Sequence, residues 1–156
     1  MKKELIKIFR IAIFALTGWI FWIKYSIRTA EERDKYEEPL FQNNLVIKGI
    51  IDEISNSGNH CFNILYLKKF TGTLPYFNPY RNKKDIFPYA IKNGNCEIYS
   101  WACVYDAKPG DSIIIDSNKR SVMIITKDTL NNVRGNLTFV GGELGYIKEH
   151  SKLKFQ

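Results

Sequence analysis

The chain has 156 residues, 45% of them hydrophobic, and a formal net charge of +7 at pH 7, which suggests a nucleic-acid or anionic-lipid partner. The distribution of charge weakens the nucleic-acid interpretation, because residues 1–28 hold six Lys and Arg against one Glu. Residues 29–156 carry 17 basic and 15 acidic side chains, a net charge of only +2, and are enough for one hydrophobic core.

The first segment, residues 1–28, has the pattern of a membrane anchor. Residues 11–23 contain no charged side chain. As a helix this run is about 20 Å long, and its extension to residues 8–27 reaches the roughly 30 Å of a bilayer core. The extension requires Arg10 and Lys24 to direct their charged ends toward the two interfaces. We therefore expect a single-pass transmembrane helix that contacts the lipid bilayer through residues 8–27.

Two other interpretations of this segment stay open. A cleaved signal peptide would use residues 1–10 as its basic region, but no pair of small residues directly follows Ile23 to mark a cleavage site. A buried core helix fits the shortness of the apolar run. Against it, the run is rich in Trp, Phe and Ile and has no polar stripe apart from Thr17.

The orientation of the anchor depends on its flanks. Four Lys and Arg precede the apolar run and four follow it within residues 24–35, so the positive-inside rule alone gives a tie. Five acidic side chains within residues 31–38 cancel the positive charge of the second flank. We expect the amino terminus inside and the large C-terminal part outside the cytoplasm.

Residues 29–43 are expected to form a charged helical stalk and a linker. Residues 29–38 lack Gly and Pro, and Arg28 and Glu32 are spaced to form an ion pair on one helix face. Pro39 should end the helix, because proline lacks a backbone donor and disfavours helical geometry in the residue before it.

Beyond the linker, short apolar and β-branched runs alternate with turn signals, as is typical of strands. Asn93-Gly94 predicts a hairpin, since both central positions of such a turn need positive φ. Pro109-Gly110 predicts a second tight turn. The seven expected strands cover residues 45–54, 60–69, 86–92, 95–105, 112–116, 121–127 and 136–140.

These elements predict a mainly β protein in which a transmembrane helix and a helical stalk precede a small antiparallel β-barrel or sandwich of about seven strands. The barrel is the preferred form, because closure removes exposed strand edges. The expected β domain covers residues 44–141, and residues 142–156 are a C-terminal tail.

Four motifs within residues 45–127 carry a resemblance. With them the chain resembles a group of small uncharacterised bacterial single-pass membrane proteins that have one N-terminal apolar helix and one compact β domain. The resemblance implies this architecture and no activity, so no functional residue follows from it. Residues 70–85 depart from the group as a longer insertion. The motifs are Gly49-Ile-Ile-Asp52, Gly58-Asn59-His60, Phe87-Pro88-Tyr89 and Lys108-Pro-Gly-Asp-Ser112-Ile.

Candidates for catalysis or metal binding are few. His60 and His150 are the two histidines, and neither lies at a metal-ligand spacing. His60 beside Cys61 could join a metal site, but a turn histidine next to an inward-facing thiol is the preferred interpretation. We assign no catalytic residue, no metal ligand and no cofactor, and leave open whether the chain is an enzyme.

The three cysteines leave the disulfide state open. One continuous strand would hold Cys96 and Cys103 about 23 Å apart, too far for a bond between them. Cys61 could pair with either across strands. Buried free thiols that act as small apolar side chains are the preferred interpretation.

Residues 68–89 are the segment with the clearest binding character. Six aromatic side chains alternate there with five cationic ones. Aromatic faces can stack on bases, sugars or other flat ligands, and cations can meet phosphates. An alternative is an ordered loop whose aromatic rings cap an open barrel end. If the segment binds a ligand, the expected contacts are Tyr76, Phe77, Tyr80, Arg81 and Tyr89.

The function that these patterns favour is a membrane-anchored extracytoplasmic β domain that acts as a binding or scaffold module for an envelope ligand or a protein partner. One alternative is a small hydrolase whose site residues converge from separate strands. The other is an OB-like barrel on the cytoplasmic side that binds single-stranded nucleic acid, a partner that we regard as less favoured.

Overall fold

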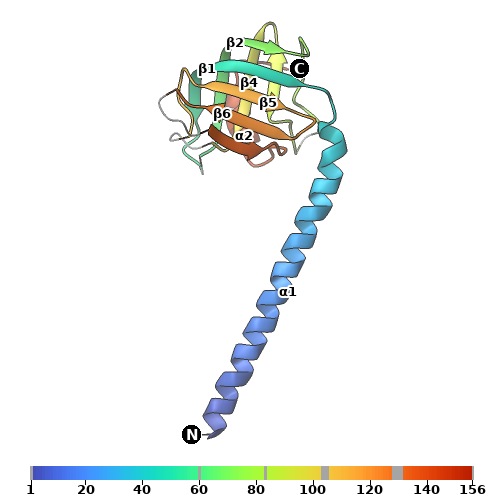
Figure 1. The fold of residues 1–156 in the computed structure, drawn as a ribbon, viewed down its shortest axis with the longest axis vertical. Coiled ribbons are helices and arrows are strands. Elements are labelled where there is room, and N and C mark those ends of the chain that lie inside the picture. Colours follow the sequence, from blue (N-terminus) through green and yellow to red (C-terminus); the bar gives the residue numbers. More distant parts are fainter. Residues whose placement is uncertain (1, 60, 83, 103–105, 128–131, 156) are drawn as a thin grey trace. The chain divides into compact units, whose positions relative to one another are not determined.

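A computed structural model describes residues 2–59, 61–82, 84–102, 106–127 and 132–155. The chain divides into two units, Met1–Leu40 and Phe41–Gln156, and each is described by itself. The first unit is helical and the second is a β domain with one short helix (Figure 1).

Helix α1 covers Lys2–Phe41 without interruption. The expected ion pair is present, since Arg28 Nε donates to Glu32 Oε1 at 2.9 Å. The expectation that Pro39 ends the helix is wrong by two residues. Phe41 is fully buried among aromatic rings of the β domain, and this packing holds the last turn in helical form.

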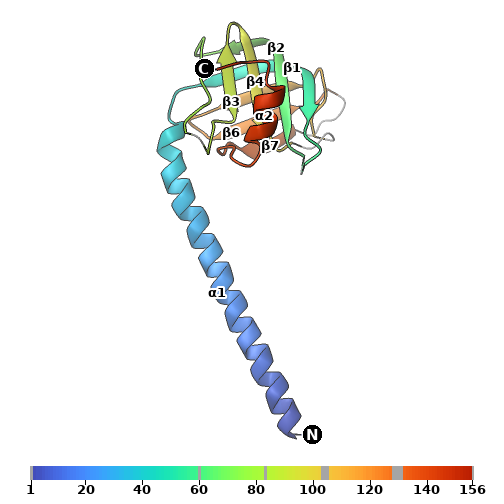
Figure 2. The ribbon, with the colours of Figure 1, turned by 180° about the vertical axis from the view of Figure 1, so that it is seen from behind.

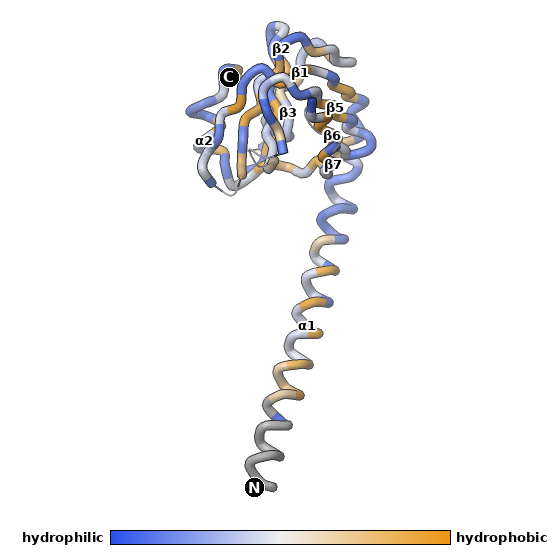
Figure 3. The backbone as a smooth tube through the Cα atoms, turned by 60° about the vertical axis from the view of Figure 1, so that its left-hand side comes forward, coloured by the Kyte–Doolittle hydropathy of each residue, from blue (hydrophilic) through white to orange (hydrophobic). Residues whose placement is uncertain are grey.

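Apolar side chains are exposed along the middle of α1, where the backbone is coloured as hydrophobic in Figure 3. In the part of the chain that the structure describes, no helix combines the length and the hydropathy needed to cross a bilayer. The transmembrane helix over residues 8–27 stays a prediction. The exposed apolar side chains are Ile13, Phe14, Leu16, Trp19, Ile20, Phe21, Trp22, Tyr25 and Ile27.

The β domain is built on one seven-stranded sheet with the order β3-β4-β2-β1-β5-β6-β7 (Figures 1 and 2). Every pair of neighbouring strands is antiparallel. The mainly β class and the number of strands are therefore confirmed. The strands are β1 (Val46–Asn56), β2 (Asn63–Gly72), β3 (Tyr89–Lys92), β4 (Asn95–Ser100), β5 (Ser112–Asp116), β6 (Ser121–Ile125) and β7 (Asn132–Asn136).

The strand bounds agree with the sequence best where a turn is tight. Between β3 and β4, Asn93 has φ 52° and Gly94 has φ 73°, as the hairpin prediction requires. Before β5, Gly110 has φ 94°, the left-handed conformation expected there. The largest shift is at β7, which ends at Asn136, where the predicted strand begins. Residues 103–105 of the predicted fourth strand lie outside the described residues.

The expected closure into a barrel is wrong, because the edge strands β3 and β7 share no ladder within the described residues. They approach only beyond their ends, where Ile86 and Val140 exchange two backbone hydrogen bonds of 3.0 and 2.9 Å. On β3, Ile91 exchanges backbone hydrogen bonds with Phe77 of the preceding loop. The loop, and not the edge strand β7, thus contacts β3 at this position.

The sheet is covered on both faces, and β2 and β4 show this by strict alternation. Leu65 and Leu67 of β2 face the larger apolar cluster, whereas Ile64 and Tyr66 face a second one. The second cluster is completed by helix α2 (Leu144–His150), through Ile147, and by the chain that follows it (Figure 2). The sequence prediction placed α2 in a tail, since seven residues are too few to show helical periodicity.

Candidate functional site

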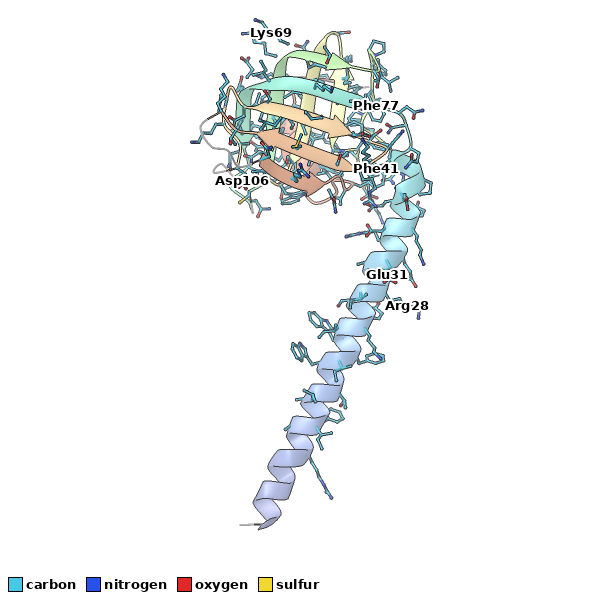
Figure 4. All side chains as sticks on the ribbon, viewed as in Figure 1. Arg28, Glu31, Phe41, Lys69, Phe77 and Asp106 are labelled. Carbon is cyan, nitrogen blue, oxygen red and sulfur yellow. The ribbon has the colours of Figure 1, made fainter. Side chains whose placement is uncertain are left out.

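Two of the five predicted contact residues belong to the core. Phe77 packs edge-to-face on Phe87 and Tyr89, with ring centroids 5.1 and 4.9 Å apart. Phe41 joins the same group at 5.5 Å from Phe87 (Figure 4 labels Phe41 and Phe77). These aromatic rings therefore pack together in or against the larger apolar cluster.

Tyr89 is fully buried within the β domain, and its contact with a ligand stays a prediction. Its hydroxyl accepts a hydrogen bond from Asn43 Nδ2 at 2.8 Å. Burial raises the pKa of Tyr89 to about 12, and the bond from Asn43 opposes that shift. Tyr89 thus stabilises the domain as a neutral phenol.

Arg81 lies against the same aromatic group from outside. Its guanidinium carbon is 4.8 Å from the ring centroid of Phe139. Phe139 in turn packs on Phe41 at 4.9 Å and on Phe87 at 4.9 Å. Arg81 is thus held by a cation–π contact at the rim of the core.

Tyr76 and Tyr80 are the predicted contact residues that reach the surface. They are 55% and 39% exposed. Both rings contact Phe155 of the C-terminal segment, with centroids 6.0 and 6.4 Å apart. The structure therefore brings two of the predicted side chains together around a third ring that the sequence did not indicate.

Beside these rings lies a surface groove of about 370 Å³, which we call the aromatic–lysine groove. It joins the loop before β3 to the end of α2 and the chain after it. Tyr76 and Lys92 border it through their contacts with Phe155. The groove is lined by Tyr80, Lys148, Ser151, Leu153, Lys154 and Phe155.

Three lysines gather at the groove. Lys92 Nζ donates to the Lys154 carbonyl and lies 5.2 Å from the Phe155 ring centroid. Lys154 Nζ donates to the Lys148 carbonyl at 3.1 Å. Among the described residues, no carboxylate lies within ion-pair distance of the ammonium groups of these three lysines. The groove therefore carries concentrated positive charge.

A buried carboxylate holds the chain that forms one wall of the groove. Glu97 of β4 is inaccessible to solvent. Its Oε1 accepts from the backbone N–H groups of Lys152 and Leu153 at 2.7 and 3.1 Å. Its Oε2 accepts from Ser151 Oγ at 2.7 Å and from the Tyr99 hydroxyl at 3.1 Å. Glu97 thus sets the course of the chain just before Lys154 and Phe155.

The sequence pattern alone concealed this wall. Lys152 and Lys154 alternate with Leu153 and Phe155, the period-two pattern of an extended segment with one apolar face. Leu153 is buried in the second apolar cluster, as that pattern would predict. The run is only four residues long, and nothing in it indicates the long-range contact with Tyr76.

A second cavity, of about 210 Å³, lies between the end of β4 and the strands β6 and β7. Its lining is mainly apolar, with Asp106 as the one carboxylate among the described lining residues. His60, considered above as a possible metal ligand, lies outside the described residues. The other histidine, His150, stacks on Tyr146 with centroids 4.0 Å apart. Within the described part of the chain, no group of His, Cys, Asp and Glu side chains could hold a metal ion.

The cysteines differ in state. Cys96 is a buried free thiol, as expected from the sequence. Burial and the charge of Glu97 raise its pKa. Cys61 is disulfide-bonded, so the expectation of a free thiol is wrong for this residue. Cys103 lies outside the described residues.

Comparison with known proteins gives no relative to reason from, since no protein family, curated protein or solved structure matches this chain. The resemblance to small bacterial single-pass membrane proteins therefore stays a prediction.

Proposed function

We propose that this chain is a single-pass, membrane-anchored binding module whose β domain lies outside the cytoplasm and presents the aromatic–lysine groove to an envelope ligand. The observation that carries the proposal is the pairing of a helix with unburied apolar side chains and a separate domain with a formed, positively charged groove.

The helix supports the anchor. Phe14, Phe21 and Trp22 are among its most exposed apolar side chains, at 81%, 75% and 64%. Apolar surface left in water costs roughly 25 cal/mol per Å², so a run of such side chains is more stable in an apolar environment. A lipid bilayer that contacts residues 8–27 supplies this environment, and Arg10 and Lys24 lie near its two interfaces.

The disulfide at Cys61 supports the extracytoplasmic location of the domain. Disulfides persist in oxidising compartments and are rare where thiols are kept reduced. This agrees with the orientation derived from the acidic flank after the apolar run. It also counts against the cytoplasmic nucleic-acid binder, although the aromatic rings and lysines of the groove would suit single-stranded bases.

Binding is favoured over catalysis because the described residues that line the groove are cations, rings, a serine and a leucine. The Glu97 carboxylate behind them is buried and already accepts four hydrogen bonds. A hydrolase would need a carboxylate or histidine within reach of a reacting atom.

The test of the anchor is membrane retention of the full chain after an alkaline carbonate wash. We expect the wild-type chain to stay with the membranes. A Phe14→Lys/Leu16→Lys variant should be released, because a lysine at the centre of a membrane helix costs roughly 2.5–3.5 kcal/mol. Tyr36→Lys, an exposed position of the same helix beyond the apolar run, is the matched control and should be retained.

Release of the wild-type chain at its full length would contradict the anchor. Release as a shortened chain would show that the segment is a cleaved signal peptide.

A further inference from the structure

We infer that the aromatic–lysine groove binds an acidic carbohydrate, a sugar polymer that bears carboxylate or phosphate groups. The inference rests on the proposed function and names the ligand of the same groove. It is argued from the charge, the rings and the rigidity of the groove.

Within the described residues, none of the three lysine ammonium groups at the groove forms an ion pair with a carboxylate. Lys92 and Lys154 each donate one hydrogen bond to a backbone carbonyl. An ammonium group has three donors, so each retains two for an external acceptor. Lys148 also lines the groove, and its carbonyl accepts the hydrogen bond from Lys154. Three like charges that lie close together repel one another, and a bound anion relieves that repulsion.

The rings offer a partly exposed aromatic surface in which the Phe155 ring is inclined by 58° to Tyr76 and by 69° to Tyr80. Tyr76 and Tyr80 flank Phe155, and more than a third of each tyrosine is open to solvent. A sugar ring can lie with its apolar face on such rings while its hydroxyl groups bond to the phenols. The aromatic rings thus lie next to lysines that can bind a carboxylate or a phosphate. An acidic sugar carries both matching parts, a ring and an anionic group.

The groove is ordered before any ligand arrives. Glu97 is held by Ser151 Oγ and by the N–H groups of Lys152 and Leu153, and these bonds fix the backbone that leads into Lys154 and Phe155. Because the groove is already ordered in the folded domain, binding does not carry the entropy cost of ordering it. The volume of about 370 Å³ lies within the range of small-ligand sites, roughly 300–1,000 Å³.

The location favours sugars over the other anions that share this chemistry. On the extracytoplasmic side, the proposed location that the disulfide at Cys61 supports, single-stranded nucleic acid is not the expected ligand. A lipid headgroup would supply the negative charge but would leave the three rings without a stacked partner. The sugar polymer is therefore the expected ligand, and the experiment below distinguishes it from nucleic acid and from lipid.

The experiment uses the full-length chain in micelles of a polyoxyethylene detergent, which has no sugar headgroup. The probe is polygalacturonate, a carboxylated sugar polymer, and neutral dextran is its control. Calorimetry at about 50 and 200 mM salt should show binding to polygalacturonate that weakens with salt, and no binding to dextran. Tyr80→Ala and Lys154→Gln should each weaken it about tenfold. Lys68→Gln, at a surface lysine 3.7 Å from Asp52 that does not line the groove, should leave it unchanged.

Four results would overturn the inference. Equal weakening by Lys68→Gln would indicate non-specific attraction of a basic surface. Equal binding of inorganic polyphosphate, unaffected by Tyr80→Ala, would indicate ion exchange without a role for the rings. Tighter binding of poly(dT) or of phosphatidylglycerol vesicles would assign the groove to nucleic acid or to lipid. Absence of binding to polygalacturonate would reject the sugar.

The carbonate wash separates this inference from the proposed function. A chain that is retained in membranes but does not bind polygalacturonate keeps its anchor and loses only this ligand. A chain that binds polygalacturonate but is washed off keeps the groove and loses the anchor. Unchanged thermal unfolding of the Tyr80→Ala and Lys154→Gln variants shows that any lost binding is local.

Discussion

Tyr89, Cys96 and Tyr99 are ionisable side chains that the fold keeps neutral. Burial is the first cause of the raised pKa in each, and for Tyr89 the value is about 12 against an ordinary 10.0. Between these two values the unfolded chain loses the Tyr89 proton while the folded chain keeps it. The unfolded state then binds fewer protons, so the free energy of unfolding falls as the pH rises.

We therefore expect the free energy of unfolding to fall between pH 10 and 12, with Tyr89 contributing about 3 kcal/mol of the loss. Urea unfolding at pH 8, 10 and 11 measures it. Tyr89→Phe should make the fall shallower, whereas Tyr76→Phe, at an exposed position, should not. An identical pH dependence in Tyr89→Phe and the wild type would show that Tyr89 ionises freely in the fold.

A substitution at Phe41 tests how much the packed aromatic rings contribute to stability. Phe41→Ala removes a fully buried ring that contacts Phe87, Tyr89 and Phe139, and should lower the free energy of unfolding by about 3–5 kcal/mol. Tyr36→Ala, exposed on the same helix, should change it by less than about 0.5 kcal/mol. Chemical denaturation decides, and a Phe41→Ala loss no larger than that of Tyr36→Ala would place Phe41 outside the core.

At the scale of single residues, the sequence showed which segment is aromatic and cationic but not which of its side chains face the core. The aromatic and cationic character of residues 68–89 was visible, but an aromatic residue in a loop can face the core or the solvent. Phe77 and Tyr89 turn inward because the unclosed side of the sheet must be filled. Tyr76 and Tyr80 stay at the surface beside Phe155, a neighbour 75 or more positions away in the chain.

At the scale of elements, the chain after α2 depends on Glu97. Glu97→Ala leaves the Lys152 N–H without its acceptor and removes one of the two acceptors of the Ser151 hydroxyl and of the Leu153 N–H. The loss should be about 2–4 kcal/mol in the free energy of unfolding, since each unsatisfied buried group costs roughly 1–3 kcal/mol. Trypsin should then cleave after Lys152 faster than in the wild type, as followed by mass spectrometry.

Glu53→Ala is the control for this change. Glu53 Oε2 pairs with Lys152 Nζ at 2.5 Å, but both side chains are more than half exposed. Exposed ion pairs contribute little, so cleavage after Lys152 should hardly change. Equal effects of the two substitutions would mean that the surface pair, and not Glu97, holds the segment.

Strands were predictable where alternation and turn chemistry agree, as at Ser112–Asp116, which follows the Pro109-Gly110 turn. Helix α2 and the segment after it were not, because their positions depend on burial against β2 and β4. The closure of the sheet was predicted wrongly for a similar reason. Edge strands can be covered by loops and side chains as well as by each other, and no local pattern distinguishes the two.

At the scale of the whole molecule, the two units should be separable. The second unit, Phe41–Gln156, contains both apolar clusters, including Phe41 itself. Expressed alone under oxidising conditions, it should give a cooperative unfolding transition and the amide dispersion of a β protein by NMR. A chain of these residues that stays unfolded would show that α1 contributes to the core of the domain.

The measurement that tests the account most directly is protease accessibility of the β domain in intact cells, in cells with the outer barrier opened and in cells with the inner membrane lysed. The account predicts digestion once the outer barrier is opened, with residues near the amino terminus left in the membrane fraction. Protection until the inner membrane is lysed would contradict it, because the domain would then lie in the cytoplasm and the groove would face a different set of ligands.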